Sequence, residues 1–349
     1  MKTVCNLLLK STIFCIAGLA FGCSNSENFF NGKFISQKIK DSPVTQKGNE
    51  IDLEIPGVTK IYIVDTFLIA FTPNNDERFL SIYSNNSLKP LFANFARRGR
   101  GPNEFNYVRL CDQHYTDHSE SIVWLNVDNY QKLMAVNVTK SVKNQSLIIE
   151  KSIDLSKYNK DNTYLIKYIT DTSLYKMEVV DQNMQLSIFN PITDKTYFNR
   201  ELYTQKTDDA SIFSSSMIIK PDQSTFFSSM GYFDQVNYIF LADKKQYSVS
   251  INKKPVLLSN INPKIEERRA YYKGTCFNDN IIVACHMNYN EKQPSIEFHI
   301  FNWEGKLVSI IKTDKPITSI CLDDNNGRLY GLDSSTEKIY YFDIKNLDL

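Results

Sequence analysis

The densest group of metal-ligand residue types is a short polar run in the first half of the chain. Its members are Asp112, His114, Asp117, His118 and Glu120. Imidazole nitrogens and carboxylate oxygens are ligands that zinc accepts in proteins. No helix is expected to fix this spacing, and the run is typical of an exposed turn between strands. We therefore predict no metal site here.

Other chemistry has less support in the sequence. His286 and His299 fall within strand-like runs and are expected to pack in the interior or line a rim. The chain contains no Gly-x-Ser-x-Gly elbow, Walker loop, GxGxxG or HExxH motif. The sequence therefore assigns no catalytic residue and no cofactor.

Cysteine usage points to buried thiols. Beyond Cys23 the chain has Cys111, Cys276, Cys285 and Cys321, and no CxxC motif. We expect free, buried side chains at these positions, because free cysteine behaves as a small apolar residue. A disulfide between Cys276 and Cys285 is the alternative, since an exported chain permits one.

A basic, glycine-rich loop is the strongest candidate for an interaction site. Gly99 and Gly101 can adopt positive φ or a close backbone approach, and Pro102 fixes its own φ. Glu104 is near enough in sequence to pair with an arginine, and Phe105 can return the chain to the core. These residues serve turn geometry alone, or they also touch a ligand or partner. The candidate loop comprises Arg97, Arg98, Gly99, Arg100, Gly101, Pro102, Glu104 and Phe105.

The string from Gly99 to Phe105 resembles the G-x-G-P-x-E-F signature of TolB-like six-bladed β-propeller lipoproteins of the Bacteroidetes type. About seven residues carry this match. The resemblance implies an all-β propeller, exported and attached by lipid to the cell envelope, most simply at the outer membrane. It leaves open whether the propeller faces the periplasm or the outside.

The N-terminus independently reads as a targeting segment. Residues 1–22 combine Lys2 and Lys10 with an apolar run too short to span a bilayer comfortably. Small residues precede Cys23, as in a bacterial lipobox, although Ala20 replaces the commoner leucine. We predict a signal peptide over 1–22 and lipidation of Cys23. An ordinary cleaved signal with an incidental Cys23 is the alternative.

The rest of the chain divides into a tether and a folded domain. Residues 23–49 are polar and contain Gly, Pro and Ser, which predicts a flexible tether. Residues 50–349 are expected to form the propeller. The chain is thus expected to be attached to a membrane by lipid and not to span it. Without the leader, 38 basic residues face 39 acidic residues, so nothing favours a nucleic-acid partner.

An internal repeat supports the propeller. Aromatic residues make up 13% of the chain, which favours strands. Six strand-like runs begin at intervals of 55, 52, 51, 56 and 47 residues, and each is followed by a partner run 10 to 16 residues on. A period near 50 with several strands per unit is typical of propeller blades. The runs are 67–71, 122–127, 174–180, 225–230, 281–287 and 328–333, with partners 80–84, 132–137, 186–190, 238–242, 297–302 and 339–343.

The ends of the repeat predict how the ring closes. The last unit offers three strands, and the first unit already has four. Residues Glu50 to Ile55 are therefore expected to form the outer strand of the last blade; an unattached strand is the alternative. Pro263 to Lys273 is the one place where we expect a helical turn.

Three functions remain open at this point. The first is an envelope binding or interaction protein, with an envelope protein or small ligand as partner. The second is a metal-assisted hydrolase or lyase in the central channel, for which Asp65, Asn126 and Asp333 are candidates by position only. The third is a polysaccharide-binding accessory protein. Converging inward acids and amides would favour the second, whereas a channel lined by apolar or Lys and Tyr side chains would exclude it.

Overall fold

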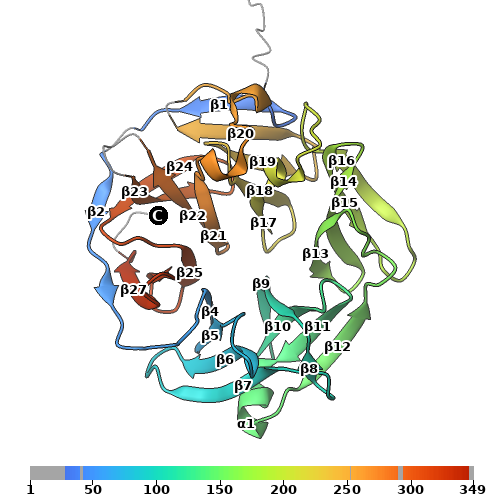
Figure 1. Cartoon of the computed structure of the whole chain (residues 1–349), viewed down its shortest axis with the longest axis vertical. Coiled ribbons are helices and arrows are strands. Elements are labelled where there is room, and N and C mark those ends of the chain that lie inside the picture. Colours follow the sequence, from blue (N-terminus) through green and yellow to red (C-terminus); the bar gives the residue numbers. More distant parts are fainter. Residues whose placement is uncertain (1–27, 40–41, 252, 290–293, 346–349) are drawn as a thin grey trace, which may run out of the picture.

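The chain folds into a ring of six β-sheets around a central axis (Figure 1). The computed structural model describes residues 28–39, 42–251, 253–289 and 294–345. The predicted six-bladed β-propeller is confirmed. The predicted signal peptide and Cys23 lie outside the described residues.

Each blade is built from antiparallel strands that follow one another outwards from the axis. Blade one contains β4 (Lys60–Val64), β5 (Phe67–Phe71), β6 (Arg78–Ser84), β7 (Pro90–Arg98) and the short parallel β8 (Glu104–Phe105); blade two contains β9 (Val108–Asp117), β10 (Glu120–Val127), β11 (Lys132–Asn137) and β12 (Ile149–Asp154). Blade three contains β13 (Thr163–Thr170), β14 (Ser173–Val180), β15 (Asn183–Phe189) and β16 (Thr196–Glu201).

The second half of the ring repeats this arrangement. Blade four contains β17 (Ser215–Ile219), β18 (Thr225–Met230), β19 (Val236–Phe240) and β20 (Gln246–Ile251), and blade five contains β21 (Tyr272–Phe277), β22 (Ile281–Asn288), β23 (Ser295–Asn302) and β24 (Leu307–Thr313). Blade six contains β25 (Ser319–Asp323), β26 (Arg328–Asp333) and β27 (Lys338–Asp343). The six predicted runs are the second strands of the blades, and their predicted partners are the third strands.

Burial on both faces of the blades explains this pattern. The described residues form six buried apolar clusters, each between two neighbouring blades. Alternate residues of a strand point to opposite faces of its sheet. In β5, Leu68 and Ala70 pack against blade six, whereas Ile69 and Phe71 pack against blade two. The second and third strands are therefore hydrophobic on both faces.

The N-terminal segment is not the flexible tether that we predicted. β1 (Lys33–Gln37) pairs in parallel with β20, and β2 (Val44–Gln46) pairs in parallel with β24, so blades four and five each gain a fifth, outer strand. Figure 1 shows both as blue strands outside the orange and red blades. Since residues 28–39 and 42–49 belong to the ring, the folded domain begins well before residue 50.

The ring closes where the sequence predicted, over a shorter strand. β3 (Asn49–Glu50) pairs antiparallel with β27 and completes blade six. The Ile51 amide extends the pairing by donating to the Ile339 carbonyl at 2.9 Å. Beyond Ile51 the expected strand ends, and Ile55 packs in the cluster between blades six and one.

One α-helix was missed. α1 (Val138–Asn144) connects β11 and β12, and the Asn137 side chain caps it by accepting from the Lys140 amide. Val138 is buried, and Val142 packs against the cluster between blades one and two. Segment 263–273 contains the expected helical turn, the 3-10 turn η3 (Ile265–Glu267), and the start of β21. Two further 3-10 turns are η1 (Ala210–Phe213) and η2 (Leu258–Asn260). None of the described helices has the length and apolar character needed to cross a membrane.

Candidate functional site

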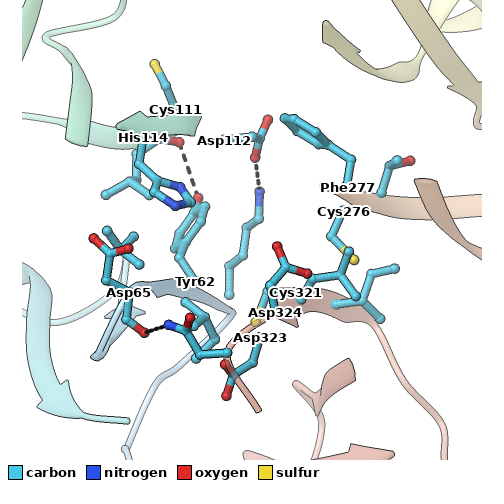
Figure 2. Close-up of a pocket in the computed structure, with 18 residues that line it drawn as sticks. Tyr62, Asp65, Cys111, Asp112, His114, Cys276, Phe277, Cys321, Asp323 and Asp324 are labelled. Carbon is cyan, nitrogen blue, oxygen red and sulfur yellow. Dashed lines mark hydrogen bonds and ion pairs between the residues drawn. The ribbon is translucent and has the colours of Figure 1, made fainter. Parts of the chain in front are cut away.

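The first strands of blades one, two, five and six line a polar cavity in the channel (Figure 2). Its volume is about 220 Å³. These strands contribute alternate side chains to the channel and to the blade interfaces, so polar and apolar residues share the lining. The polar lining comprises Lys60, Asp65, Asp112, His114, Thr275, Asp323, Asp324 and Asn325, and the remainder includes Tyr62, Leu110, Cys111, Cys276, Phe277 and Cys321.

Two lysines hold one carboxylate at the centre of this lining. Asp112 Oδ1 lies 3.0 Å from Lys60 Nζ, and its Oδ2 lies 2.5 Å from Lys167 Nζ. Lys167 also donates to the Met217 carbonyl at 3.2 Å, so the group joins blades one to four. Burial alone would raise the pKa of Asp112, but the two ammonium groups outweigh it and hold that pKa well below its ordinary value. We call Lys60, Asp112 and Lys167 the channel triad.

The polar run that includes Asp112 is not an exposed turn, which corrects our expectation. Most of it forms the long strand β9, whose alternation directs Asp112 and His114 to the cavity. Asp117 and His118 lie at the exposed hairpin, with His118 Nε2 3.6 Å from Asp117 Oδ1. Glu120 instead accepts from Lys140 and Asn137. The five residues are therefore not brought together.

A second hollow of about 580 Å³ continues from the cavity. It shares Asp112, His114, Phe277 and Asp324 with the cavity. Its wall adds an aromatic pair, Trp124 stacked on Tyr168 with ring centroids 3.9 Å apart, and the exposed Tyr115. The Trp124 indole N–H is buried without a hydrogen-bond partner among the described residues.

The other carboxylates of the cavity each accept hydrogen bonds from different side chains. Asp323 Oδ2 accepts from Asn85 and Asn326 at 2.8 Å each. Asp65 accepts from the Ser121 hydroxyl at 2.5 Å, and Asp324 accepts from the Asn278 amide at 2.7 Å. Hydroxyl and amide donors therefore satisfy these carboxylates, which do not converge on one point.

Two of the three channel candidates lie elsewhere. Asp65 does line the cavity. Asn126 is on the second strand of blade two and donates to the Ile166 carbonyl at 2.9 Å, between blades two and three. Asp333 ends β26 and accepts from the Ser335 amide at 3.0 Å. Our positional argument was wrong for both, because the second strands do not face the channel.

The environment of His114 suits a neutral donor or acceptor. His114 is exposed at the edge of the cavity, and partial desolvation there lowers the pKa of its imidazole, while Asp65 and Asp324 oppose that shift. The imidazole is thus neutral at pH 7 and has one N–H and one bare nitrogen to offer a ligand. It adjoins the triad and both hollows, which makes it the best-placed side chain for contact with a bound molecule.

The basic loop lies at the outer edge of blade one, away from the cavity. Arg98 donates to the Asn75 carbonyl at 2.9 Å and to the Pro73 carbonyl at 2.5 Å, and its guanidinium covers the Phe79 ring at 4.0 Å. These contacts tie it to the β5–β6 turn, at the opposite end of the blade from Asp65.

Most of the other predicted loop residues also make contacts within the chain. Glu104 accepts from the Gly101 amide at 2.9 Å, and Phe105 is buried in the core. A Cβ on Gly99, whose φ is +153°, would lie 2.0 Å from Glu104 Oε2. Arg97 and Arg100 differ, because their side chains are exposed. Only these two leave a guanidinium free to meet another molecule.

The four cysteines are free, as expected, and all except the partly buried Cys276 are buried. Cys285 lies opposite Gly274 in the hairpin, and Cys276 lies opposite Val283, so the two do not form a direct cross-strand pair. Burial raises the pKa of the Cys285 thiol to about 12. A protonated, buried thiol is a poor nucleophile, so these residues act as packing groups.

His286 and His299 are buried, as expected, but they have a partner that we missed. Glu297 Oε2 lies 3.2 Å from His299 Nε2 and 4.0 Å from His286 Nδ1. Burial, with a contribution from His286, lowers the pKa of His299 to about 4. The signal was present in the sequence: Glu297 and His299 are two residues apart in a strand, so both face one side.

These sheets and this channel define a six-bladed β-propeller with a polar cavity on its axis. Solved structures agree on the fold. A member of the DUF4221 family from Bacteroides vulgatus has a TM-score of 0.51 and 11% identity, over 90% of this chain and 97% of that one. Hydrazine synthase from Kuenenia stuttgartiensis also has a TM-score of 0.51, with 10% identity over 89% and 99%.

A further structure, a putative exported protein from Bacteroides fragilis, has a TM-score of 0.48 and 10% identity, over 86% of this chain and 88% of that one. No protein-family model matches the chain, and no curated protein matches it. At these identities the likeness extends to the fold alone. The TolB-like assignment stays a prediction.

Proposed function

We propose that this chain is a lipid-anchored binding protein of the cell envelope that takes a small polar ligand into its channel. The observation that carries the proposal is the preorganised cavity beside the channel triad. Ligand sites are typically concave, largely preformed and fixed by a few convergent polar groups. The cavity and its adjoining hollow offer such groups, from Asp112, His114 and Asp324, beside the aromatic Phe277.

The same lining argues against metal-assisted hydrolysis in the channel. That chemistry needs several acids or amides aimed at one ion. Here Lys60 and Lys167 neutralise Asp112, and amide or hydroxyl donors occupy Asp65 and Asp323. Tyr62, whose hydroxyl donates to the Leu110 carbonyl, adds an aromatic ring to the same lining. Binding is the function that this arrangement supports best.

Filling the cavity is expected to abolish ligand capture. The protein would be dialysed against a small-molecule extract of its own cell envelope, and the retained compounds would be identified by mass spectrometry. His114→Trp places a bulky ring in both hollows and should retain less than about a tenth of the compound held by the wild type, because more than 1.4 kcal/mol of binding is lost.

The matched control is His118→Trp, on the same hairpin with a side chain that is 95% exposed. It should retain the compound like the wild type. Equal retention by the two variants, or no compound enriched by the wild type, would contradict a ligand site in the channel.

The basic loop is a second proposed contact surface, for an envelope protein. Replacing Arg97 and Arg100 with alanine removes two exposed guanidinium groups while keeping Arg98, which holds the turn. We expect a partner recovered with the wild type from solubilised envelope to be lost. Arginine is enriched at protein interfaces, which supports this expectation.

A control with the same loss of charge is the double replacement of the exposed Lys132 and Lys206 with alanine, which should keep the partner. Recovery of the partner by the Arg97, Arg100 variant at the wild-type level would remove the loop from the interface.

The proposed anchor is a lipid on Cys23, supported by the lipobox-like sequence. The Cys23→Ser variant should move from the detergent phase to the aqueous phase on Triton X-114 partition. Acylated lipoproteins partition with detergent because each buried CH₂ contributes about 0.8 kcal/mol. A Cys23→Ser protein that stays in the detergent phase would show that something else holds the chain to the membrane.

A further inference from the structure

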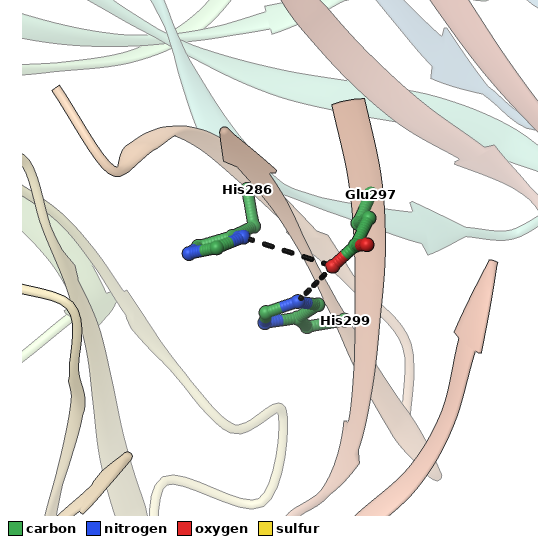
Figure 3. Close-up of side chains that lie close together, drawn as sticks. All are labelled: His286, Glu297 and His299. Carbon is green, nitrogen blue, oxygen red and sulfur yellow. Dashed lines mark hydrogen bonds and ion pairs between the residues drawn. The ribbon is translucent and has the colours of Figure 1, made fainter. Parts of the chain in front are cut away.

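We propose that His286, Glu297 and His299 bind a divalent transition-metal ion, of which zinc is the best fit, on the face of blade five that meets blade four. Figure 3 shows the two imidazole rings directed at one oxygen of the Glu297 carboxylate. One donor atom from each residue lies within 4.8 Å of the others. All three side chains are buried.

The strand register brings these residues together. His286 on β22 lies directly opposite Glu297 on β23, and His299 follows Glu297 by two residues, so all three point to the same side of the sheet. On both strands the neighbouring residues Ala284 and Phe301 pack in the cluster between blades four and five. The fold therefore sets three ligand side chains on two rigid, adjacent strands.

The proposed ligand atom of His286 makes no hydrogen bond to another described residue. The Nδ1 atom of His286 is buried and has no hydrogen-bond partner among the described residues. A buried, unpaired imidazole nitrogen costs free energy, and a metal ion at this position would use its lone pair. This orphaned atom points toward the same carboxylate oxygen that His299 Nε2 contacts.

Each ligand side chain also has a polar partner at its other nitrogen or oxygen atom. His286 Nε2 lies 3.0 Å from Asp234 Oδ1 of blade four, and His299 Nδ1 lies 3.1 Å from the Tyr272 hydroxyl. The Asn288 amide donates to the other Glu297 oxygen at 2.7 Å. Carboxylate and hydroxyl partners on the far nitrogen of each imidazole are the usual outer contacts of metal-binding histidines.

The distances between the ligand atoms are near those of a zinc site, but the two imidazole rings are stacked with centroids 4.2 Å apart, so at least one ring must rotate to aim its lone pair at a shared ion. Ligand atoms around tetrahedral zinc, at about 2.0–2.1 Å from the metal, are about 3.4 Å from one another. The Glu297 oxygen lies 3.2 and 4.0 Å from the two imidazole nitrogens. Two histidines and one glutamate suit zinc and neighbouring divalent ions, and calcium or magnesium would prefer oxygen ligands throughout.

The site is separate from the channel cavity. In blade five, Tyr272 lies opposite His286 at the start of β21, whereas Phe277, which lines the cavity, lies opposite Ile282 at its other end. Through Asp234 the cluster also contacts the turn between β18 and β19. A bound ion would therefore stabilise the contact between blades four and five without entering the ligand site.

Metal titration of the purified, chelator-treated full chain tests the proposal. We expect the wild type to bind one Zn²⁺ per chain, to raise its thermal midpoint with Zn²⁺, and to give visible Co²⁺ absorption typical of four or five ligands. Glu297→Gln keeps the shape of the side chain and should weaken zinc by more than about 100-fold. Asp234→Asn, which removes only an outer contact, should weaken it by roughly 10–100-fold.

His118→Ala is the control, because that histidine is exposed and outside the cluster; it should bind zinc like the wild type. Circular dichroism would confirm that each variant is folded. If a variant does not fold, the Co²⁺ spectrum of the wild type still shows whether the protein binds the metal ion. Absence of stoichiometric zinc binding to the wild type, or wild-type affinity in Glu297→Gln, would overturn the proposal.

Discussion

Replacing Asp112 with asparagine is expected to destabilise the propeller by about 3 kcal/mol. Removing one member of a buried ion pair typically costs about 3–5 kcal/mol, because the remaining charge is left uncompensated. Here the side chain of Lys167 is only 13% exposed, whereas that of Lys60 is 38% exposed and can reach water. We therefore expect a loss of stability at the lower end of this range. Urea unfolding followed by tryptophan fluorescence would measure the change.

A control variant and a double variant distinguish the loss of the Asp112 charge from a loss of packing. Asp117→Asn is on the same strand, with a side chain that is 65% exposed, and should change stability by less than about 0.5 kcal/mol. Adding Lys167→Met to Asp112→Asn should restore part of the loss, since an apolar replacement of both partners is often tolerated. Additive losses in the double variant would show that the triad is not an energetic unit.

The same group predicts how the difference depends on pH. The pKa of Asp112 is lower in the folded chain than its ordinary value of 3.8, so its contribution is present above about pH 4 and is lost as the pH falls further. The wild type and Asp112→Asn should therefore converge in stability below about pH 4. A constant gap between pH 7 and pH 3 would contradict the assigned role of this carboxylate.

Replacing Phe29 with alanine is expected to destabilise the protein by about 3–5 kcal/mol, as buried Phe-to-Ala changes usually do. Phe29 is fully buried, and its ring stacks between Phe233 at 4.4 Å and Tyr203 at 4.6 Å, with Phe213 at 6.3 Å. A residue in a flexible tether would tolerate this change. The measurement is again chemical unfolding.

Phe34→Ala provides a matched control from the same segment. Phe34 lies on the outer strand β1 and is only partly buried, so its loss should cost about 1 kcal/mol. If both substitutions changed the free energy of unfolding by nearly zero, the N-terminal segment would not hold blades three and four together in solution.

The sequence predicted the strands that are buried on both faces in every blade, but it defined the strands that face solvent or the channel only in the first and last blades. β5 is a continuous apolar run, β26 has a buried centre between Arg328 and Asp333, and both matched their predicted bounds. β1 and β2 lie at sheet edges and carry polar residues, so their composition resembled a tether. α1 is a short helix rich in β-branched residues, which gives a weak helical pattern.

The candidate site was harder to predict, for a physical reason. Asp112 is 52 residues from Lys60 and 55 from Lys167, and only the packing of blades one, two and three around the axis places them side by side. The residue types were visible, but their partners depend on which strand lies innermost. Glu297 was within reach of prediction, since its spacing from His299 places both on one face of a strand. Arg97 and Arg100 are exposed, with Arg97 near the end of β7, and their predicted role as contact residues stays a prediction.

The fate of a captured ligand tests the central claim most directly. The compound retained by the wild type would be titrated into fresh protein by calorimetry and then recovered for mass spectrometry. We predict one binding site per chain and recovery of the compound with its mass unchanged. A converted product, or binding that persists in His114→Trp, would contradict a binding protein whose ligand site is the propeller channel.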